Sequence, residues 1–414
     1  MNRKLNVYLC GSKIGVLSED DLLQLSFQYN SNETRSLSVY LPIRNEIYSH
    51  AEAFPFFENL SPEGEAFEIL TKNHVSENKI FSILDRFGGD CAGAVAFYEG
   101  KPENNNEETL HEISAEKFTQ IIDKLPEDPL LTSLENPPRL SLAGAQSKFA
   151  VYKYENKYYR SNDDYPTTHI IKITNKRFPN LLKNELFCMK LAQIMELNVP
   201  DIELKTAGNH PYLEIERYDR YVENGIVRRV HQEDFCQALG LVSDRKYQTR
   251  SGVSLRNCCR VIEKFSENRL WDINSFVEWI VFNYLIGNTD AHAKNLSLLH
   301  TETGIKLAPF YDLLSTEVYS IKIVDHYMAM LINGKGRYDS VTYSDFLALF
   351  EQLGLNVTNM MKNIKNKFAL IISIAEKLSQ NLIDSKLPET DTKDNKIYDD
   401  IIAIIKKRLN ILLK

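Results

Sequence analysis

Hydrophobic residues follow two different periods in the two halves of the chain. In the first 45 residues, and again between residues 149 and 216, they alternate with polar residues over short runs, which predicts β-strands. After Arg220 the spacing is mostly helical, and we expect helices at 232–240, 254–266, 272–286, 343–353, 358–383 and 394–413. A strand-rich part followed by a helical part predicts an α+β fold.

Polar stretches between these segments divide the chain into four parts. We expect a β-rich N-terminal module over 1–107, with short strands up to residue 41 and a small-residue segment at 88–99 that turns into a further strand. A connector over 108–139 carries one helix, and a strand-rich lobe follows over 140–225. A mostly helical lobe over 226–414 ends the chain. The helices expected before residue 140 lie at 63–74, 77–87 and 115–125.

Composition excludes some classes of protein. Lys and Arg total 49 and Asp and Glu total 56, and the net charge of −7 argues against a chain that coats nucleic acid through a basic surface. The best membrane candidate, 277–286, is too short for a spanning helix and contains Glu278 and Asn283. The six cysteines form no C-x-x-C motif, which favours free thiols in a reducing compartment over structural zinc. We therefore expect a soluble cytoplasmic protein with no membrane segment.

The segment 287–295, GNTDAHAKN, carries an Asp and an Asn five residues apart. Phosphoryl transfer to a hydroxyl needs a carboxylate beside that hydroxyl and oxygen ligands for a metal ion, and in kinases one short loop supplies both with this spacing. Asp290 is then the candidate base and Asn295 a candidate metal ligand. The spacing alone is weak, but here it lies between an apolar helix and an apolar strand.

Further charged residues fit the same chemistry. Asp312 follows a short strand and suits the second metal ligand, although Leu313 and Leu314 stand where Phe and Gly are usual. Lys172 ends an apolar strand and is a candidate to bind phosphate; the alternative is a lysine that extends along the surface to solvent. Glu185, on the next helix, could pair with Lys172, and a solvated helix acid is the alternative.

Two segments could line a nucleotide. Residues 140–148, LSLAGAQSK, precede a strand and contain small residues, which let backbone N–H groups approach phosphates. Gly144 is their single glycine, so they do not form a glycine-rich motif. Residues 214–220, EIERYDR, close the strand-rich region, where a hinge would hold a nucleobase through backbone bonds. A charged surface turn is the alternative for this second segment.

Together these motifs resemble those of the HipA family, bacterial serine/threonine kinases that are the toxins of toxin–antitoxin pairs. The resemblance covers nearly the whole chain. It rests on NLSPEG at 59–64, GGDCAGAV at 88–95, LSLAGAQSK, THIIK, NE at 184–185, ERYDR, HQEDFCQALG, GNTDAHAKN and LAPFYDLLS. It implies a protein-kinase-like bilobal fold with an N-terminal β-rich module and a mostly helical C-terminal lobe. It also implies ATP and Mg²⁺.

The resemblance implies a role for each candidate residue. Asp290 would be the catalytic base, Asn295 and Asp312 the Mg²⁺ ligands and Lys172 the phosphate-binding lysine, with Glu185 as its candidate partner. The other residues expected near the nucleotide are Ala143, Gly144, Ala145 and Gln146 of the phosphate loop (142–148), Glu216 and Tyr218 of the hinge, and Gln232, His292 and Lys294.

Regulation and partners follow from the same resemblance. Ser141 would be the autophosphorylation site, with Ser147, where an acidic residue is common in the family, as the second choice. A phosphate there adds roughly −1.5 to −2 charge, which would repel bound ATP and eject the loop. The partner would be a HipB-like helix-turn-helix antitoxin, through which the toxin meets operator DNA. For some family members the protein substrate is glutamate–tRNA ligase, whose modification stops aminoacylation and causes growth arrest.

Two other functions stay open at this point. A small-molecule kinase of the choline or aminoglycoside type uses the same Asp–Asn spacing, although the resemblance extends beyond the active site. A catalytically silent kinase fold could act as a co-regulator, although the four polar catalytic positions are all present. Asn288 and Thr289, just before the catalytic Asp, depart from the family pattern and leave the base and metal positions intact.

Overall fold

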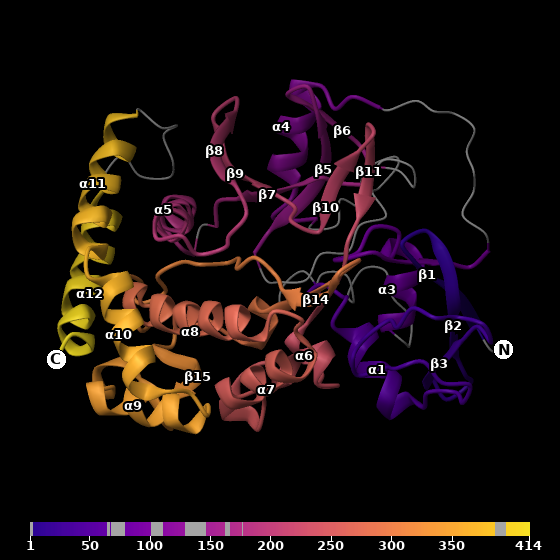
Figure 1. The fold of residues 1–414 in the computed structure, drawn as a ribbon. Helices are drawn as coiled ribbons and strands as arrows, with labels where there is room; N and C mark the ends of the chain where they lie inside the picture. The colour runs from indigo at the N-terminus through magenta and orange to yellow at the C-terminus, as the bar shows by residue number, and fades with distance from the viewer. Residues whose placement is uncertain are drawn as a thin grey trace.

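The computed structural model describes residues 3–63, 67, 79–100, 111–128, 146–161, 166–175, 177–385 and 395–414. They form an N-terminal module, a strand-rich lobe and a helical lobe (Figure 1). In this view the module lies at the lower right, the strand-rich lobe at the top and the helical lobe at the lower left. This is the α+β architecture that the sequence predicts.

The N-terminal module is built on an antiparallel sheet with strand order β3-β2-β1-β4. Its strands are β1 (Arg3–Leu9), β2 (Ser12–Glu19), β3 (Leu25–Tyr29) and β4 (Val95–Tyr98). Strand residues alternate between a solvent face and a core shared with α1 (His50–Glu58) and α3 (Lys79–Phe87), where Leu5, Phe27 and Phe57 are buried. The helix predicted at 63–74 lies almost entirely outside the described residues.

The strand predicted at 37–41 does not form, although Leu37 and Leu41 are buried as its alternating pattern requires. A side chain satisfies its backbone groups in place of a neighbouring strand. The Tyr29 hydroxyl accepts a hydrogen bond from the Leu37 N–H at 2.7 Å and donates one to the Leu41 carbonyl at 2.6 Å. Because buried backbone groups need partners but not necessarily from a strand, the segment takes an irregular path.

The strand-rich lobe contains one antiparallel sheet with strand order β6-β5-β7-β9-β8. Its strands are β5 (Lys148–Tyr154), β6 (Lys157–Tyr159), β7 (His169–Ile173), β8 (Ile202–Ala207) and β9 (His210–Glu216). Helix α4 (Ala115–Lys124) packs on one face, and α5 (Leu181–Ile194) packs against β8 and β9. Ile171 and Ile173 of β7 face α4, so Lys172 between them faces the opposite side, where α5 lies.

Three short strands follow this sheet, where the sequence predicts mostly helix. They are β10 (Arg220–Glu223), β11 (Ile226–Arg229) and β12 (His231–Asp234). The first two form a hairpin, and β12 pairs with β13 (Ser297–Thr301), which also pairs with β14 (Gly304–Leu307). The predicted helix at 232–240 is therefore wrong in its first part, and only α6 (Phe235–Ala238) is helical. The hydrophobic pattern misses β12 because its buried residues, His231 and Glu233, are polar.

The helical lobe surrounds α8 (Arg269–Ile286), which is buried along most of its length. The other helices are α7 (Leu255–Phe265), α9 (Tyr343–Gln352), α10 (Val357–Phe368), α11 (Ile371–Asp384) and α12 (Lys396–Leu412), and a hairpin of β15 (Tyr327–Ile332) and β16 (Lys335–Arg337) lies among them. The single helix predicted at 358–383 is two helices. Phe368 and Ile371 are both buried on either side of the break, which leaves Leu370 exposed.

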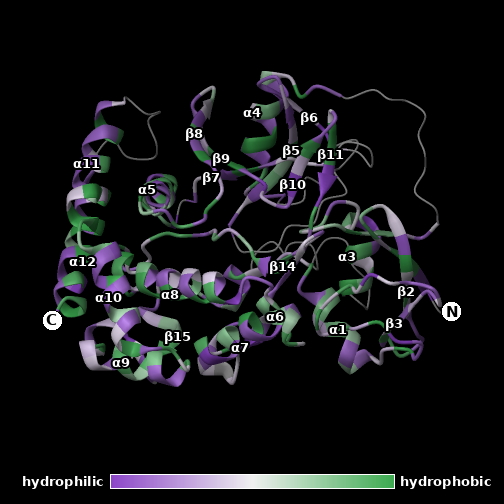
Figure 2. Ribbon diagram, viewed as in Figure 1, coloured by the Kyte–Doolittle hydropathy of each residue, from purple (hydrophilic) through white to green (hydrophobic). Residues whose placement is uncertain are grey.

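Hydrophobic residues are spread over the helices and strands of all three parts (Figure 2). Within the ranges that the structure describes, no helix is long and apolar enough to cross a bilayer. All six cysteines are free thiols, and five of them are buried.

Candidate active site

A cavity of about 690 Å³ is lined by residues from all three parts of the molecule. Its wall contains eleven of the residues predicted from the sequence: Gln146, Lys172, Glu185, Glu216, Tyr218, Gln232, Asp290, His292, Lys294, Asn295 and Asp312. Ser147, just before β5, is half-buried and does not line it. The predicted loop residues Ser141, Ala143, Gly144 and Ala145 lie outside the described residues.

Lys172 of β7 joins two carboxylates in this wall. Its ammonium lies 2.5 Å from the Glu185 carboxylate of α5 and also forms an ion pair with Asp312. The side chains of Lys172 and Glu185 are 6% and 1% exposed, whereas that of Asp312 is 33% exposed. The alternatives of a solvent-directed lysine and a solvated helix acid are therefore wrong. Of the three residues, Asp312 is the one that is open to the cavity.

Burial and charge act against each other in this cluster. Burial alone would lower the pKa of Lys172, but the charges of Asp312 and Glu185 outweigh it and raise the pKa. Burial would likewise raise the pKa of Asp312, but Lys172 and Lys148 hold it at about 2. For Glu185 burial prevails and raises the pKa despite the attraction of Lys172. The cluster therefore presents an ionised Asp312 to the cavity at neutral pH.

The loop after α8 carries the candidate base and a candidate metal ligand. Gly287 ends the helix with φ +77°, a conformation that favours glycine. Asn288 then donates to the Asn283 side chain at 2.8 Å and accepts from the Asp290 N–H at 3.1 Å. The Asn295 side-chain NH2 donates to the Asp290 carbonyl at 3.3 Å. This bond does not use the side-chain oxygen of Asn295. The Asp290 carboxylate is exposed to the cavity.

His292 and Lys294 lie on the same loop and are both buried. Burial lowers the pKa of His292 to about 4, against the attraction of Asp290, so its imidazole is neutral at pH 7. The Lys294 ammonium lies 2.7 Å from the Asn59 side-chain oxygen and 3.1 Å from the Asp234 carboxylate. A contact between Lys294 and a nucleotide would therefore compete with contacts inside the protein.

The predicted hinge residues lie together on another part of the wall. The Tyr218 hydroxyl donates to the Gln232 side chain at 2.5 Å, and the Tyr218 ring stacks on Tyr311 with centroids 5.8 Å apart. Glu216 is exposed, and its N–H donates to the Asp201 carbonyl at 3.0 Å. This part of the wall offers aromatic surface of the kind on which a planar base can pack.

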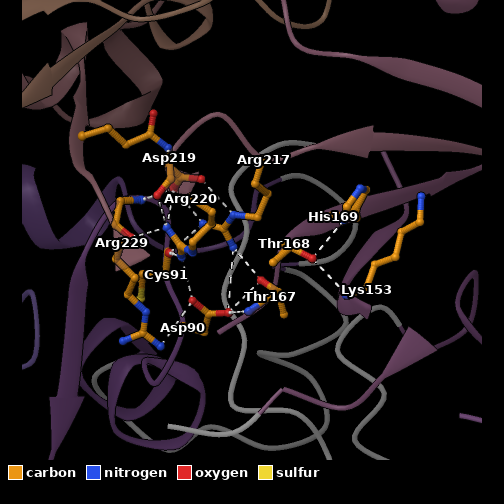
Figure 3. Close-up of polar contacts among 12 residues, drawn as sticks. Asp90, Cys91, Lys153, Thr167, Thr168, His169, Arg217, Asp219, Arg220 and Arg229 are labelled. Carbon is orange, nitrogen blue, oxygen red and sulfur yellow. Dashed lines mark hydrogen bonds and ion pairs between the residues drawn. The ribbon is translucent and has the colours of Figure 1, made fainter. Parts of the chain in front are cut away.

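The charges that follow the hinge are buried, so the alternative of a charged surface turn is wrong. Figure 3 shows the polar contacts that they make. Arg217 donates to both carboxylate oxygens of Asp219, at 2.9 and 2.8 Å. Arg220 donates to Asp90 of the N-terminal module at 2.7 Å, and Asp90 also accepts from the Thr167 N–H at 2.9 Å. We call Asp90, Arg217, Asp219 and Arg220 the arginine cluster.

Sequence reasoning did not assign a role to two other residues of the wall, Lys148 and Tyr247, although Lys148 belongs to the expected phosphate loop. Lys148 begins β5, directly opposite Lys172 of β7, and burial lowers its pKa. Tyr247 donates from its hydroxyl to the Asp290 carboxylate at 2.9 Å. Lys148 stands at the end of a segment already expected to line phosphates, so its position was a usable signal. Nothing in the sequence around Tyr247 indicates its contact.

The donor atoms at Asp312 and Asn295 fit a divalent metal of the Mg²⁺ type. Both residues offer oxygen, the ligand that such hard cations prefer, and nucleotide phosphates commonly complete their coordination. Asp312 also has φ +55°, in the left-handed region that non-glycine residues rarely adopt. Strained backbone of this kind occurs preferentially at functional sites.

The sequence matches two known domain families. Residues 140–376 match the HipA-like C-terminal domain, and residues 5–98 match the HipA N-terminal domain. The chain is 35% identical to the protein Y4mE of Sinorhizobium fredii over 97% of both chains. It is 30% identical to the serine/threonine-protein kinase toxin HipA of Shewanella oneidensis, over 79% of this chain and 78% of that protein.

A solved structure has the same fold over the full length. It is the complex of the Shewanella oneidensis toxin–antitoxin system HipA, HipB and operator DNA. The matched chain superposes with a TM-score of 0.80 at 26% sequence identity, covering 99% of this chain and 98% of the other. The protein-kinase-like bilobal architecture with its additional N-terminal module is thereby confirmed.

Proposed function

The chain belongs to the HipA family of toxin kinases, and we propose that it is an ATP- and Mg²⁺-dependent serine/threonine protein kinase and the toxin of a HipBA-like toxin–antitoxin pair. One observation carries this proposal. The enclosed Lys172–Glu185 pair, the ionised Asp312 and the Asp290–Asn295 loop converge on one cavity. A lysine–glutamate pair next to a metal-binding Asp is the arrangement that an active protein kinase needs.

Each residue has a role in this proposal. Asp290 accepts the proton of the incoming serine or threonine hydroxyl, for which its exposed carboxylate is available. Lys172, held by Glu185, binds phosphate oxygens of ATP. Asn295 and Asp312 hold Mg²⁺, which would neutralise charge on the phosphates. Asp312 now pairs with Lys172, so metal and phosphate binding would loosen that contact while Glu185 keeps the lysine in place.

The base and the phosphate loop complete the nucleotide site. We propose that the backbone at Glu216 and Tyr218 binds adenine and that Gln232 lies beside it, as the packing of Tyr218 on Tyr311 supports. The neutral His292 lines the site without adding charge. Residues 142–148 would bind the phosphates, and Ser141, with Ser147 as second choice, would be the autophosphorylation site.

Partners and substrate follow from the family. We propose a HipB-like helix-turn-helix antitoxin as the partner, with operator DNA bound mainly through the complex. The complex of the Shewanella oneidensis HipA with HipB and its operator DNA supports this. The protein substrate would be a translation component, glutamate–tRNA ligase or another aminoacyl-tRNA synthetase, whose phosphorylation causes growth arrest. The net charge of −7 agrees with a chain that does not itself coat DNA.

The proposal is tested by expressing the wild type and Asp290→Asn from an inducible promoter. We expect the wild type to stop growth and to add phosphoserine or phosphothreonine to a small set of proteins, and Asp290→Asn to do neither. Asp339→Asn, on an exposed side chain of the helical lobe, is the control and should behave as the wild type. Growth arrest by Asp290→Asn equal to that of the wild type would contradict the proposal. Phosphorylated small alcohols without phosphoproteins would favour a small-molecule kinase.

A further inference from the structure

The N-terminal module reaches the catalytic loop through Lys294. The Lys294 ammonium has four oxygen atoms around it: the Asn59 carbonyl at 3.0 Å, the Asn59 side-chain oxygen at 2.7 Å, Glu63 at 3.1 Å and Asp234 at 3.1 Å. The two Asn59 oxygens accept hydrogen bonds from the ammonium, and the Glu63 and Asp234 carboxylates form ion pairs with it. The Lys294 side chain is 4% exposed. Lys294 is thus an anchor between the module and the loop.

Glu63 of the module makes a second ion pair on the other side of its carboxylate. Its Oε1 faces Lys294, and its Oε2 lies 2.5 Å from the Lys246 ammonium. Lys294 lies on the catalytic loop, whereas Lys246 lies just before η2 (Gln248–Arg250). Burial would raise the pKa of Glu63, but the two lysines lower it to about 2, so the bridge is ionised at neutral pH.

The segment that Glu63 holds through Lys246 also touches the candidate base. Tyr247, the next residue, donates its hydroxyl to the Asp290 carboxylate at 2.9 Å. Its ring meets His292 edge-on, with centroids 5.5 Å apart. In addition, the Ala293 N–H donates to the Lys246 carbonyl at 3.4 Å. The 246–247 segment and the catalytic loop are therefore in direct contact, and Glu63 binds both.

We propose that Glu63 is a positioning residue for phosphoryl transfer: by bridging Lys294 and Lys246, it holds Tyr247 against Asp290 and fixes the direction of the catalytic carboxylate. This inference rests on the proposed kinase function. It makes the N-terminal module part of the catalytic unit, because one of its side chains orients a group 227 positions away in the sequence, from residue 63 to residue 290. A small misplacement of a catalytic group can lower a rate by about 100-fold.

An inhibitory role would predict the opposite sign. Glu63 could instead occupy a place meant for phosphate and hold the two lysines away from ATP. Lys294, however, keeps three other oxygen contacts without Glu63, so removing Glu63 does not free it for a phosphate. The geometry therefore favours a role for Glu63 in orienting Asp290. A lower rate without Glu63 would support this role, and a higher rate would support inhibition.

The test compares Glu63→Gln with Glu46→Gln, a control at an exposed glutamate of the same module. The rate is measured as transfer of labelled phosphate from ATP to casein, a generic acceptor, and to the chain itself. We expect Glu63→Gln to lower kcat about 10- to 100-fold while the KM for ATP changes by less than about threefold. A merely structural role would lower the midpoint of thermal unfolding and leave kcat of the folded fraction unchanged. Glu46→Gln should match the wild type in every readout.

Tyr247→Phe provides a second measurement that removes only the hydroxyl. It should lower kcat in the same direction, and in the double variant with Glu63→Gln the two losses should overlap rather than multiply. This variant decides the matter if Glu63→Gln fails to fold. A wild-type kcat in Tyr247→Phe, or a kcat in Glu63→Gln that equals or exceeds the wild type, would overturn the inference alone. No transfer by the wild type itself would overturn the proposed function and the inference with it.

Discussion

The arginine cluster and the group of Lys172, Glu185 and Asp312, here called the Lys172 cluster, are both buried ion-pair groups, yet they face different surroundings. In the arginine cluster all four side chains are at most 6% exposed. Both of its carboxylates accept hydrogen bonds from arginines and from backbone N–H groups. In the Lys172 cluster the lysine and Glu185 are equally enclosed, but Asp312 opens onto the cavity.

The difference separates charges that hold the fold from charges that are available to a ligand. A buried ion pair is costly to break because the remaining charge is left without a partner, but it contributes little when all its groups are satisfied inside the protein. A charged group that is held by one enclosed partner and faces a cavity on its other side can bind a ligand there without losing the enclosed partner. The arginine cluster therefore joins the N-terminal module to the proposed hinge, and the Lys172 cluster is the group that we propose binds the nucleotide.

The largest effect on the rate of phosphate transfer is expected at Asp312 of the Lys172 cluster. Asp312→Asn should lower the rate of phosphate transfer by about 100-fold or more, because it removes the charge proposed to hold the metal. Lys172 keeps its pair with Glu185, so the free energy of unfolding should change by less than about 2 kcal/mol. The two quantities are measured by labelled-phosphate transfer and by urea unfolding. A strong loss of stability with a normal rate would place Asp312 among the structural charges.

The reverse result is expected at Asp90. Asp90→Asn removes one of the two carboxylates that pair with Arg220, the other being Asp219 at 3.0 Å, and should lower the free energy of unfolding by about 3–5 kcal/mol. Below the unfolding temperature, the rate of the folded protein should stay within about threefold of the wild type. Asp85→Asn, in the same module but on a side chain that is 36% exposed, is the matched control for urea unfolding. Equal destabilisation by the two variants would show that the arginine cluster stabilises the fold no more than an exposed ion pair does.

A smaller effect is expected from His231, which lies between the module and the helical lobe. Its ring contacts the Leu37 carbonyl at 2.8 Å, and burial together with His300 lowers its pKa to about 3, against the attraction of Asp219. As pH falls below about 6.5, the unfolded chain takes up a proton at this residue and the folded chain does not, so stability decreases toward acid.

His231→Gln should reduce the dependence of the free energy of unfolding on pH, because glutamine does not titrate. The slope is measured as the free energy of unfolding from pH 7 to pH 5, where one such histidine contributes at most about 1.4 kcal/mol per pH unit. The other histidines are unchanged in this variant, so the difference reports His231 and its interaction with His300. Parallel slopes for the variant and the wild type would show that His231 is not held neutral.

The smallest effect is expected at the pair of Arg228 and Glu223 on the β10–β11 hairpin. The two side chains are 50% and 52% exposed and lie 3.3 Å apart. Arg228→Ala should change the free energy of unfolding by less than about 1 kcal/mol, as solvent screens such pairs. A larger decrease in the free energy of unfolding, measured with heat or urea, would mean that solvent exposure does not distinguish weak surface ion pairs from the buried pairs of the arginine cluster.

Sequence patterns predicted the fold where burial followed hydrophobicity. The strands β1–β3 and β5–β9 were found because most of their buried residues are apolar. β12 was missed because it buries His231 and Glu233, and 37–41 was misassigned because the Tyr29 hydroxyl replaces a partner strand. The domain boundaries and the autophosphorylation site stay predictions.

In the candidate site, sequence reasoning found the residues whose spacing is fixed by chemistry. One loop must carry both Asp290 and Asn295, so their separation is a signal in itself. Contacts between distant segments leave no such signal. Glu63 and Lys246 are 183 positions apart, and Asp90 and Arg220 are 130 apart, so only the folded chain brings them together.

The most direct measurement is labelled-phosphate transfer by purified wild type and Asp290→Asn, with ATP binding measured on the same samples. We expect the wild type to transfer phosphate only when a divalent metal is added. Asp290→Asn should bind ATP with an unchanged affinity and transfer phosphate at least about 100-fold more slowly. Equal rates for the two proteins, with ATP bound in both, would contradict the assignment of this cavity as a kinase active site.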